Sequence, residues 1–123
     1  MPQYEAPTPD PRFSGIGPFT LVGTMSGTSL DGLDLAQVVF WKDAPTGPWQ
    51  KRIEATHFIS YADTPWAKDL PAAYTASAAQ RIQTSKAYSR WLNAQLTSFI
   101  GDSNVDAVAS HGHTVAHAPE THF

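Results

Sequence analysis

The stretch GTMSGTSLDGLD, residues 23–34, places glycine and hydroxyl residues between two apolar runs. One run precedes the cluster at 19–22, and the other follows it at 33–41. This arrangement predicts two strands joined by a short loop. Backbone N–H groups in such a loop can face an anion, since glycine lets the chain approach a phosphate closely and Ser or Thr adds hydrogen-bond donors. We interpret the stretch as a hairpin that binds the phosphates of a nucleotide.

A simple turn would have the same composition, so both interpretations stay open on the residues alone. The carboxylate of Asp31 would repel a bare phosphate, and it favours phosphate binding only if a divalent cation lies between them. The stretch is not a Walker A loop, because no lysine follows Gly27 and no helical pattern begins there. It is not a nucleophile elbow either, since Ser26 is one residue out of the G-x-S-x-G spacing.

Hydrophobic periodicity divides the rest of the chain into further strands and helices. The third strand should be half-buried, because Ile53, Ala55, His57 and Ile59 alternate with polar residues and would share one face. A short helix should begin at Pro65, in the first helical position. In chain order, strands are expected at 19–25, 32–41 and 50–61, helices at 65–74 and 78–99, and a last strand at 105–110. The order β-β-β-α-α-β predicts an α/β fold with a mixed sheet.

The composition argues against several classes of function. The 123 residues carry a formal net charge of −3 and scattered basic side chains, so no nucleic-acid surface is expected. No run reaches the ~20 apolar residues of a membrane-spanning helix, so no membrane role is expected. The absence of cysteine excludes a disulfide framework and is compatible with the cytoplasm.

The first 18 residues differ in composition from the rest. They are rich in proline and lack the apolar stretch of a signal peptide. We expect a flexible leader at 1–18 and one domain, or the N-terminal part of one, at 19–123.

Four of the five histidines lie between residues 111 and 122. They follow the last predicted strand, and ligands of open α/β sheets gather beyond the carboxyl ends of strands, so this segment and the hairpin are candidate neighbours. Three roles stay open. His111, His113 and His117 could ligate a metal, although no cysteine accompanies them. Neutral imidazoles could instead bind sugar hydroxyls beside Gly112, and His117 and His122 could be ordinary surface residues.

Taken together, two motifs closely resemble the anhydro-N-acetylmuramic acid kinase family. They are GTMSGTSLDGLD at 23–34 and SHGHTVAHAPE at 110–120, and the resemblance extends over residues 19–123. The second motif is similar to the family's His-Gly-Gln-Thr pattern, with His113 where glutamine is commoner. The resemblance implies part of a ribonuclease-H-like domain of the actin/hexokinase/Hsp70-type kinase superfamily.

The resemblance also implies a reaction and its site. The enzyme would use ATP and Mg²⁺ to phosphorylate 1,6-anhydro-N-acetylmuramic acid while water opens the ring, giving N-acetylmuramic acid 6-phosphate. It would act in the cytoplasm, in cell-wall sugar recycling, and form a homodimer at full length. Asp31 would orient Mg²⁺ or its waters. The residues implied to bind the nucleotide are Gly27, Thr28, Ser29, Leu30, Asp31, Gly32, Leu33 and Asp34, and those implied to bind the sugar are His111, Gly112, His113 and Thr114.

The resemblance leaves one gap, the catalytic residue. The family's catalytic aspartate lies downstream of residue 123, so the chain alone is expected to be inactive and no catalytic residue is assigned. Asp106 or Glu120 could be offered as substitutes, but no motif supports either. Two alternatives stay open: a non-catalytic remnant of a sugar kinase that binds a nucleotide or a partner, and a histidine-ligated metalloprotein.

Overall fold

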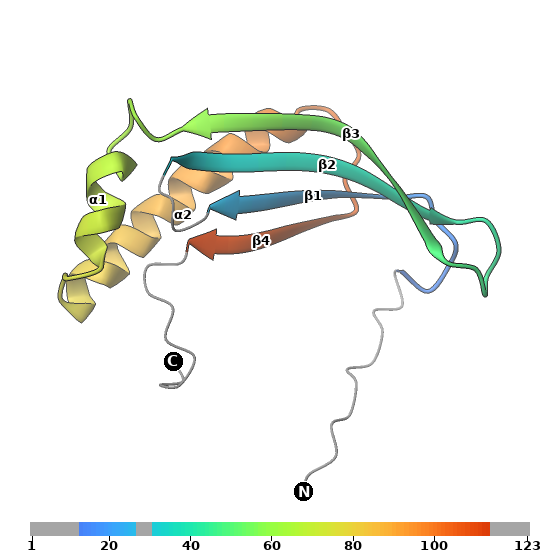
Figure 1. Ribbon diagram of the computed structural model, residues 1–123, viewed down its shortest axis with the longest axis horizontal. Coiled ribbons are helices and arrows are strands. Elements are labelled where there is room, and N and C mark those ends of the chain that lie inside the picture. Colours follow the sequence, from blue (N-terminus) through green and yellow to red (C-terminus); the bar gives the residue numbers. More distant parts are fainter. Residues whose placement is uncertain (1–12, 27–30, 114–123) are drawn as a thin grey trace, which may run out of the picture.

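A four-stranded sheet with the strand order β3-β2-β1-β4 organises the chain (Figure 1). The computed structural model describes residues 13–26 and 31–113. Along the chain the elements are β1 (Phe19–Ser26), β2 (Gly32–Lys42), β3 (Trp49–Ser60), α1 (Trp66–Ala73), α2 (Ala78–Ile100) and β4 (Ala107–His113). The predicted order β-β-β-α-α-β is confirmed.

The sheet is mixed, as predicted. β2 pairs antiparallel with both β1 and β3, whereas β4 pairs parallel with β1. Parallel neighbours need a crossover connection, and the two helices lie in the segment between β3 and β4. The carboxyl ends of β1 and β4 consequently lie at the same edge of the sheet.

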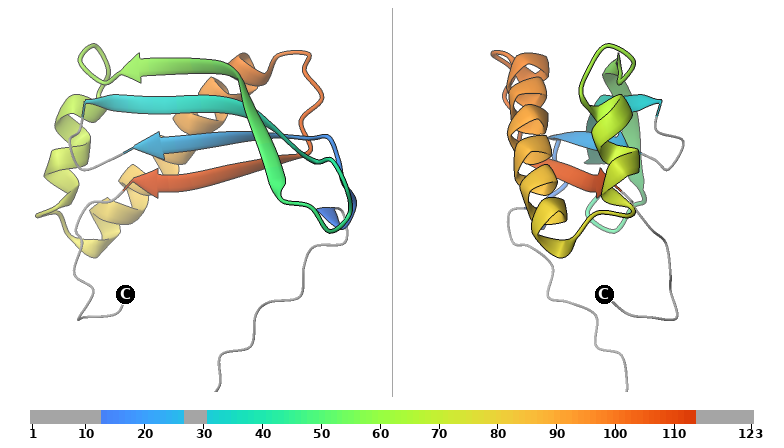
Figure 2. Two further views of the ribbon diagram at one scale, coloured as in Figure 1. Left: turned by 45° about the vertical axis from the view of Figure 1, so that its right-hand side comes forward. Right: turned by 90° about the vertical axis from the view of Figure 1, so that its left-hand side faces the viewer.

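One face of the sheet is covered by helix α2 (Figure 2). Helix α1 lies beyond the ends of β2 and β3 and packs beside α2. The core forms where these helices meet the sheet, because their apolar side chains are removed from water there. Its buried members are Leu33, Leu35, Tyr61, Trp66, Leu70 and Tyr88.

The opposite face of the sheet carries no helix among the described residues. Met25, Ile53 and Phe58 are 57%, 64% and 49% exposed, and their strand partners place them on this face. A shallow hollow of about 640 Å³ opens over β1, β2 and β4, with Gly23 and Ala36 among its lining residues. Small side chains at these positions leave the space unfilled.

The third strand is more exposed than the sequence predicts. Nearly all residues of β3 are exposed, so the expectation of a half-buried strand is wrong. Gln37 and Val38 of β2 pair with Ala55 and Ile53 of β3, which leaves Glu54 as an extra residue. Such a β-bulge interrupts the alternation of side chains. Ile53 therefore lies on the opposite face from Ala55, not on the shared face that the sequence predicts.

Local hydrogen bonds fix where the helices begin. Ser77 Oγ accepts a hydrogen bond from the Gln80 N–H (3.2 Å), and Gln80 Oε1 accepts one from the Ser77 N–H (3.3 Å). This reciprocal capping box begins α2. At the start of α1, Thr64 Oγ1 accepts from the Trp66 N–H (3.2 Å). Neither helix is long and apolar enough to cross a membrane.

Residues 13–18, at the end of the predicted leader, contact the sheet. The Phe13 and Phe19 rings meet edge to face with centroids 5.1 Å apart. The Ile16 carbonyl accepts a hydrogen bond from the Lys42 N–H (2.8 Å). The remainder of the predicted leader, residues 1–12, lies outside the described residues.

Candidate functional site

The two sequence motifs meet at the carboxyl ends of β1 and β4. Ser26, the last residue of β1, is the strand partner of His113, the last residue of β4. The two strands are parallel neighbours, so both finish at the same end of the sheet. The backbone thus brings together the hairpin and the histidine segment, as the sequence predicts from the position of the strand ends.

Strand β4 continues further than the sequence predicts. It ends at His113 and not at Ser110, so the first histidines of the cluster belong to the strand. Thr24 pairs with Ser110 and Ser26 pairs with His113, which leaves an extra residue in β4. Thr24 Oγ1 also donates a hydrogen bond to Ser110 Oγ (3.1 Å) just before this irregularity. Bulges are common beside active sites because they change where side chains are directed.

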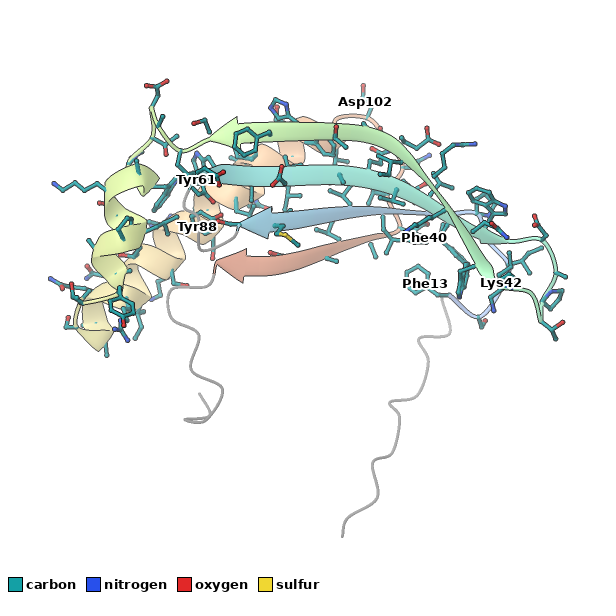
Figure 3. All side chains as sticks on the ribbon, viewed as in Figure 1. Phe13, Phe40, Lys42, Tyr61, Tyr88 and Asp102 are labelled. Atoms are coloured by element: carbon teal, nitrogen blue, oxygen red, sulfur yellow. The ribbon has the colours of Figure 1, made fainter. Side chains whose placement is uncertain are left out.

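The hairpin is held at both ends by Tyr61, which follows β3 (Figure 3). The Tyr61 hydroxyl and Ser26 Oγ share a hydrogen bond of 2.5 Å. The Tyr61 N–H donates to the Asp31 carbonyl (3.1 Å). Residues 27–30, which lie between Ser26 and Asp31 and hold four of the predicted nucleotide contacts, are outside the described residues.

A cluster of aromatic rings surrounds this tyrosine. The Tyr61 hydroxyl shares a second hydrogen bond with the Tyr88 hydroxyl (2.7 Å). The ring centroids of Tyr61 and Trp91 are 5.9 Å apart, and those of Trp66 and Tyr88 are 5.1 Å apart. Burial raises the pKa of Tyr61 above its usual range. The hydrogen bond with Ser26 acts in the opposite direction, but the hydrogen bond with Tyr88 and the charge of Asp31 add to the increase. Its phenol therefore stays neutral in the folded protein.

This raised pKa predicts a loss of stability in alkali. The unfolded chain ionises Tyr61 near its ordinary pKa of 10.0, whereas the folded protein keeps the proton. The unfolded state then binds fewer protons, so the free energy of unfolding should fall as the pH rises above 10, by up to about 1.4 kcal/mol per pH unit. Urea denaturation between pH 9 and 11 measures this slope. Tyr61→Phe should show a shallower decline, and parallel declines in both proteins would contradict the assignment.

The two aspartates of the predicted site lie in different surroundings. Asp31 is exposed and directly precedes β2. Asp34 is exposed on the helix-free face, where its strand partners are Met25 and Phe58. Mg²⁺ is commonly held by one or two carboxylates together with the phosphates of its ligand, so a single carboxylate at Asp31 suits that ion without a cage of protein ligands.

Two other predicted contacts are buried. The Leu33 side chain is 1% exposed and packs in the core, so only its backbone could reach a ligand. Gly32 is buried against β3, and a Cβ atom there would lie 2.5 Å from the Ile59 carbonyl oxygen. Both residues therefore support the hairpin from within the fold.

Asp106 lies at the other end of the strands. Its carboxylate accepts a hydrogen bond from the Thr20 N–H (2.7 Å), and its own N–H donates to the Thr20 carbonyl (2.8 Å). Thr20 and Ser26 are six residues apart along β1, which corresponds to about 20 Å of extended chain. Asp106 therefore joins the beginnings of β1 and β4 and is too far from the hairpin to replace a catalytic aspartate there.

The described part of the chain does not test the histidine-ligated alternative, because the side chains of His111 and His113 lie outside it. Among the side chains of residues 13–26 and 31–110, no three His, Cys, Asp or Glu gather where they could hold a metal ion. Thr114, His117, Glu120 and His122 lie outside the described residues. The sugar-binding roles predicted for His111, Gly112, His113 and Thr114 consequently stay predictions, as does the metal alternative.

The sequence does not reveal the hydrogen-bonded chain formed by Ser26, Tyr61 and Tyr88. The first two are 35 residues apart in sequence and the last two are 27 apart. No motif has this spacing, and each residue is ordinary in its own segment. One usable signal was that a buried tyrosine needs a partner for its hydroxyl.

Both motifs lie within the part of the chain that matches a known protein family. The family model described as anhydro-N-acetylmuramic acid kinase matches residues 19–123. An anhydro-N-acetylmuramic acid kinase of Roseobacter denitrificans is 32% identical over 117 aligned residues, and the match covers 85% of this chain and 26% of the relative. The chain thus spans about a quarter of the length of this curated relative.

Proposed function

Because the chain belongs to the anhydro-N-acetylmuramic acid kinase family, we propose that it is part of an enzyme that transfers a phosphoryl group from ATP to 1,6-anhydro-N-acetylmuramic acid. In this reaction the C1–O6 bond of the sugar breaks and the oxygen of water bonds to C1. O6 takes the γ-phosphoryl group, and the water's second proton is released. The products are N-acetylmuramic acid 6-phosphate and ADP. We place the reaction in the cytoplasm, and we expect the enzyme to form a homodimer.

The residues of the hairpin would bind the nucleotide. Gly27, Thr28 and Ser29 would donate hydrogen bonds to its phosphates, because phosphoryl transfer depends on positioning and on stabilising negative charge. Asp31 would hold Mg²⁺ or its waters, and Asp34 would serve the same loop. Bound Mg²⁺ would neutralise charge that develops on the phosphates.

The histidine segment would bind the sugar. His111, Gly112, His113 and Thr114 would meet it beyond the end of β4. Imidazole nitrogens donate and accept hydrogen bonds, so they suit sugar hydroxyls and the lactyl carboxylate. The order of strands and helices is compatible with part of a ribonuclease-H-like domain, which we propose as the fold of this lobe.

One observation carries the proposal: the partnership of Ser26 with His113. It joins one residue of each motif, where β1 and β4 end, and the two motifs are far apart in the sequence and both belong to the matched range. A nucleotide and a sugar bound at these two ends would lie side by side, as transfer between them requires. If residues 23–34 formed only a simple turn, there would be no functional reason for the motif at 110–120 to lie beside them.

Replacing Gly27 by valine tests the nucleotide half of the proposal. A branched side chain should prevent the close approach of the phosphates, so the dissociation constant for Mg-ATP should rise at least about tenfold. Isothermal titration calorimetry of the purified protein measures it. Gly23→Ala, in β1 where a Cβ would meet nothing closer than 4.0 Å, is the matched control and should bind normally. Unchanged affinity in Gly27→Val would refute phosphate binding by the hairpin.

The whole reaction is tested with the product of the complete reading frame. Transfer of ³²P from γ-labelled ATP to the anhydro sugar is the expected result. Binding of ATP without transfer to any sugar would instead favour the non-catalytic remnant. A stoichiometric zinc content that His111→Ala abolishes would favour the metalloprotein.

A further inference from the structure

We propose that Tyr61 is the positioning residue of the hairpin, because it fixes Ser26 and Asp31, the residues on either side of 27–30, relative to each other. Ser26 ends β1 and Asp31 precedes β2, whereas Tyr61 comes from the end of β3. The consequence for ligand binding rests on the proposed function. The structural consequence does not, and it can be measured without any ligand.

Tyr61 reaches the two residues through different groups. Its side-chain hydroxyl lies 2.5 Å from Ser26 Oγ, and its backbone nitrogen lies 3.1 Å from the Asp31 oxygen. The Ser26 side chain is fully buried and Tyr61 is 1% exposed, so water does not compete for the first of these bonds. A single residue therefore links the end of β1 to the beginning of β2.

Tyr61 is itself held from several sides. Its carbonyl accepts hydrogen bonds from Thr64 Oγ1 (2.8 Å) and from the Thr64 N–H (2.9 Å). Its hydroxyl also bonds the Tyr88 hydroxyl at 2.7 Å. Its ring packs against Tyr88 and Trp91 of α2, with centroids 6.4 Å and 5.9 Å away. The backbone N–H, the carbonyl and the hydroxyl of Tyr61 all form hydrogen bonds. Tyr61 therefore holds Ser26 and Asp31 in fixed positions relative to the core.

Fixing these ends should matter for an anion ligand. Donors held in place before binding lose less conformational entropy when the ligand arrives, which raises affinity. Losing the Tyr61 hydroxyl would remove the side-chain bond that holds Ser26 to the end of β3. Ser26, at the end of β1, would then be fixed less firmly relative to Asp31.

Tyr61→Phe tests the inference, because it removes the hydroxyl and keeps the ring and the backbone N–H. Hydrogen exchange of the purified protein without ligand should speed up at least about tenfold in the peptide spanning 25–32, relative to peptides of the core. Mg-ATP should bind about tenfold more weakly, a change of about 1.4 kcal/mol. The partner variant Ser26→Ala should give the same two changes, and combining both substitutions should add little, since they break the same bond.

Tyr88→Phe is the control for stability alone, because it removes a hydroxyl from the same cluster and leaves the bond between Tyr61 and Ser26 in place. Tyr74→Phe is the control for replacing a tyrosine by phenylalanine in general, because the Tyr74 side chain is 59% exposed. If Tyr61→Phe accelerates exchange at 25–32 no more than Tyr88→Phe does at equal loss of stability, the positioning role is overturned. If the wild-type protein binds no Mg-ATP while the exchange result holds, the proposed function fails and the positioning of the hairpin stands.

Discussion

Substituting Asp31 by asparagine should lower turnover by at least about a hundredfold, which corresponds to about 2.7 kcal/mol of transition-state stabilisation. Asparagine has almost the same shape but no charge, so it would hold Mg²⁺ and its waters weakly beside the phosphates. The fold should survive, because Asp31 is exposed and Tyr61 binds its backbone carbonyl, which the substitution keeps. Steady-state kinetics with Mg-ATP and the anhydro sugar, on the product of the complete reading frame, measure the effect.

Asp102→Asn is the matched control for this experiment. Asp102 is an exposed aspartate in the turn after α2, and Figure 3 shows it well away from Tyr61. The same loss of charge there should leave turnover unchanged. Partial recovery of the Asp31→Asn enzyme at raised Mg²⁺ concentration is also expected, because mass action offsets weaker binding of the ion. Turnover of Asp31→Asn close to the wild-type value would remove Asp31 from the metal role.

The sequence predicts the elements of the fold well, because each has a local pattern. Strands β1 and β2 are apolar runs on either side of a glycine-rich turn, and α2 has helical periodicity that ends at Gly101. Each of these three elements extends one residue further at its end than predicted, whereas β4 ends three residues later. The neighbouring positions of the two motifs follow from a general rule of α/β sheets, whereas the pairing of β1 with β4 is not predicted.

What the sequence does not predict depends on contacts between distant segments. The bulge at Glu54 leaves no local pattern, since it arises where β3 pairs with β2. The last residues of β4 are histidine and glycine, which do not favour strands. They belong to the sheet because β4 pairs with β1 there. The link from Tyr61 to Ser26 likewise exists only once the sheet has formed. The strands and helices of this chain can therefore be predicted from local sequence patterns. The hydrogen bonds that hold the candidate site cannot, because they join residues that are distant in the sequence.

Gly32→Ala should destabilise the protein by about 3 kcal/mol, because the added methyl group has no space. Its Cβ would lie 2.5 Å from the Ile59 carbonyl oxygen and closer to the Phe58 ring than van der Waals contact allows. The ring can turn away, but the carbonyl cannot, since Ile59 is paired with Leu33 in the sheet. Relief requires β2 and β3 to separate next to Asp31. Urea denaturation followed by circular dichroism measures the change in the free energy of unfolding.

Gly23→Ala separates this steric effect from the general cost of replacing a strand glycine. Gly23 also lies within a strand, but a Cβ there would meet only the Ala109 carbonyl oxygen, at 4.0 Å. This variant should be as stable as the wild type or slightly more so, because alanine restricts the unfolded chain more than glycine does. Equal stability of the two variants would mean that β3 yields at Ile59. In that case Gly32 would be needed for the ligand and not for the fold, and its loss should appear as weaker Mg-ATP binding alone.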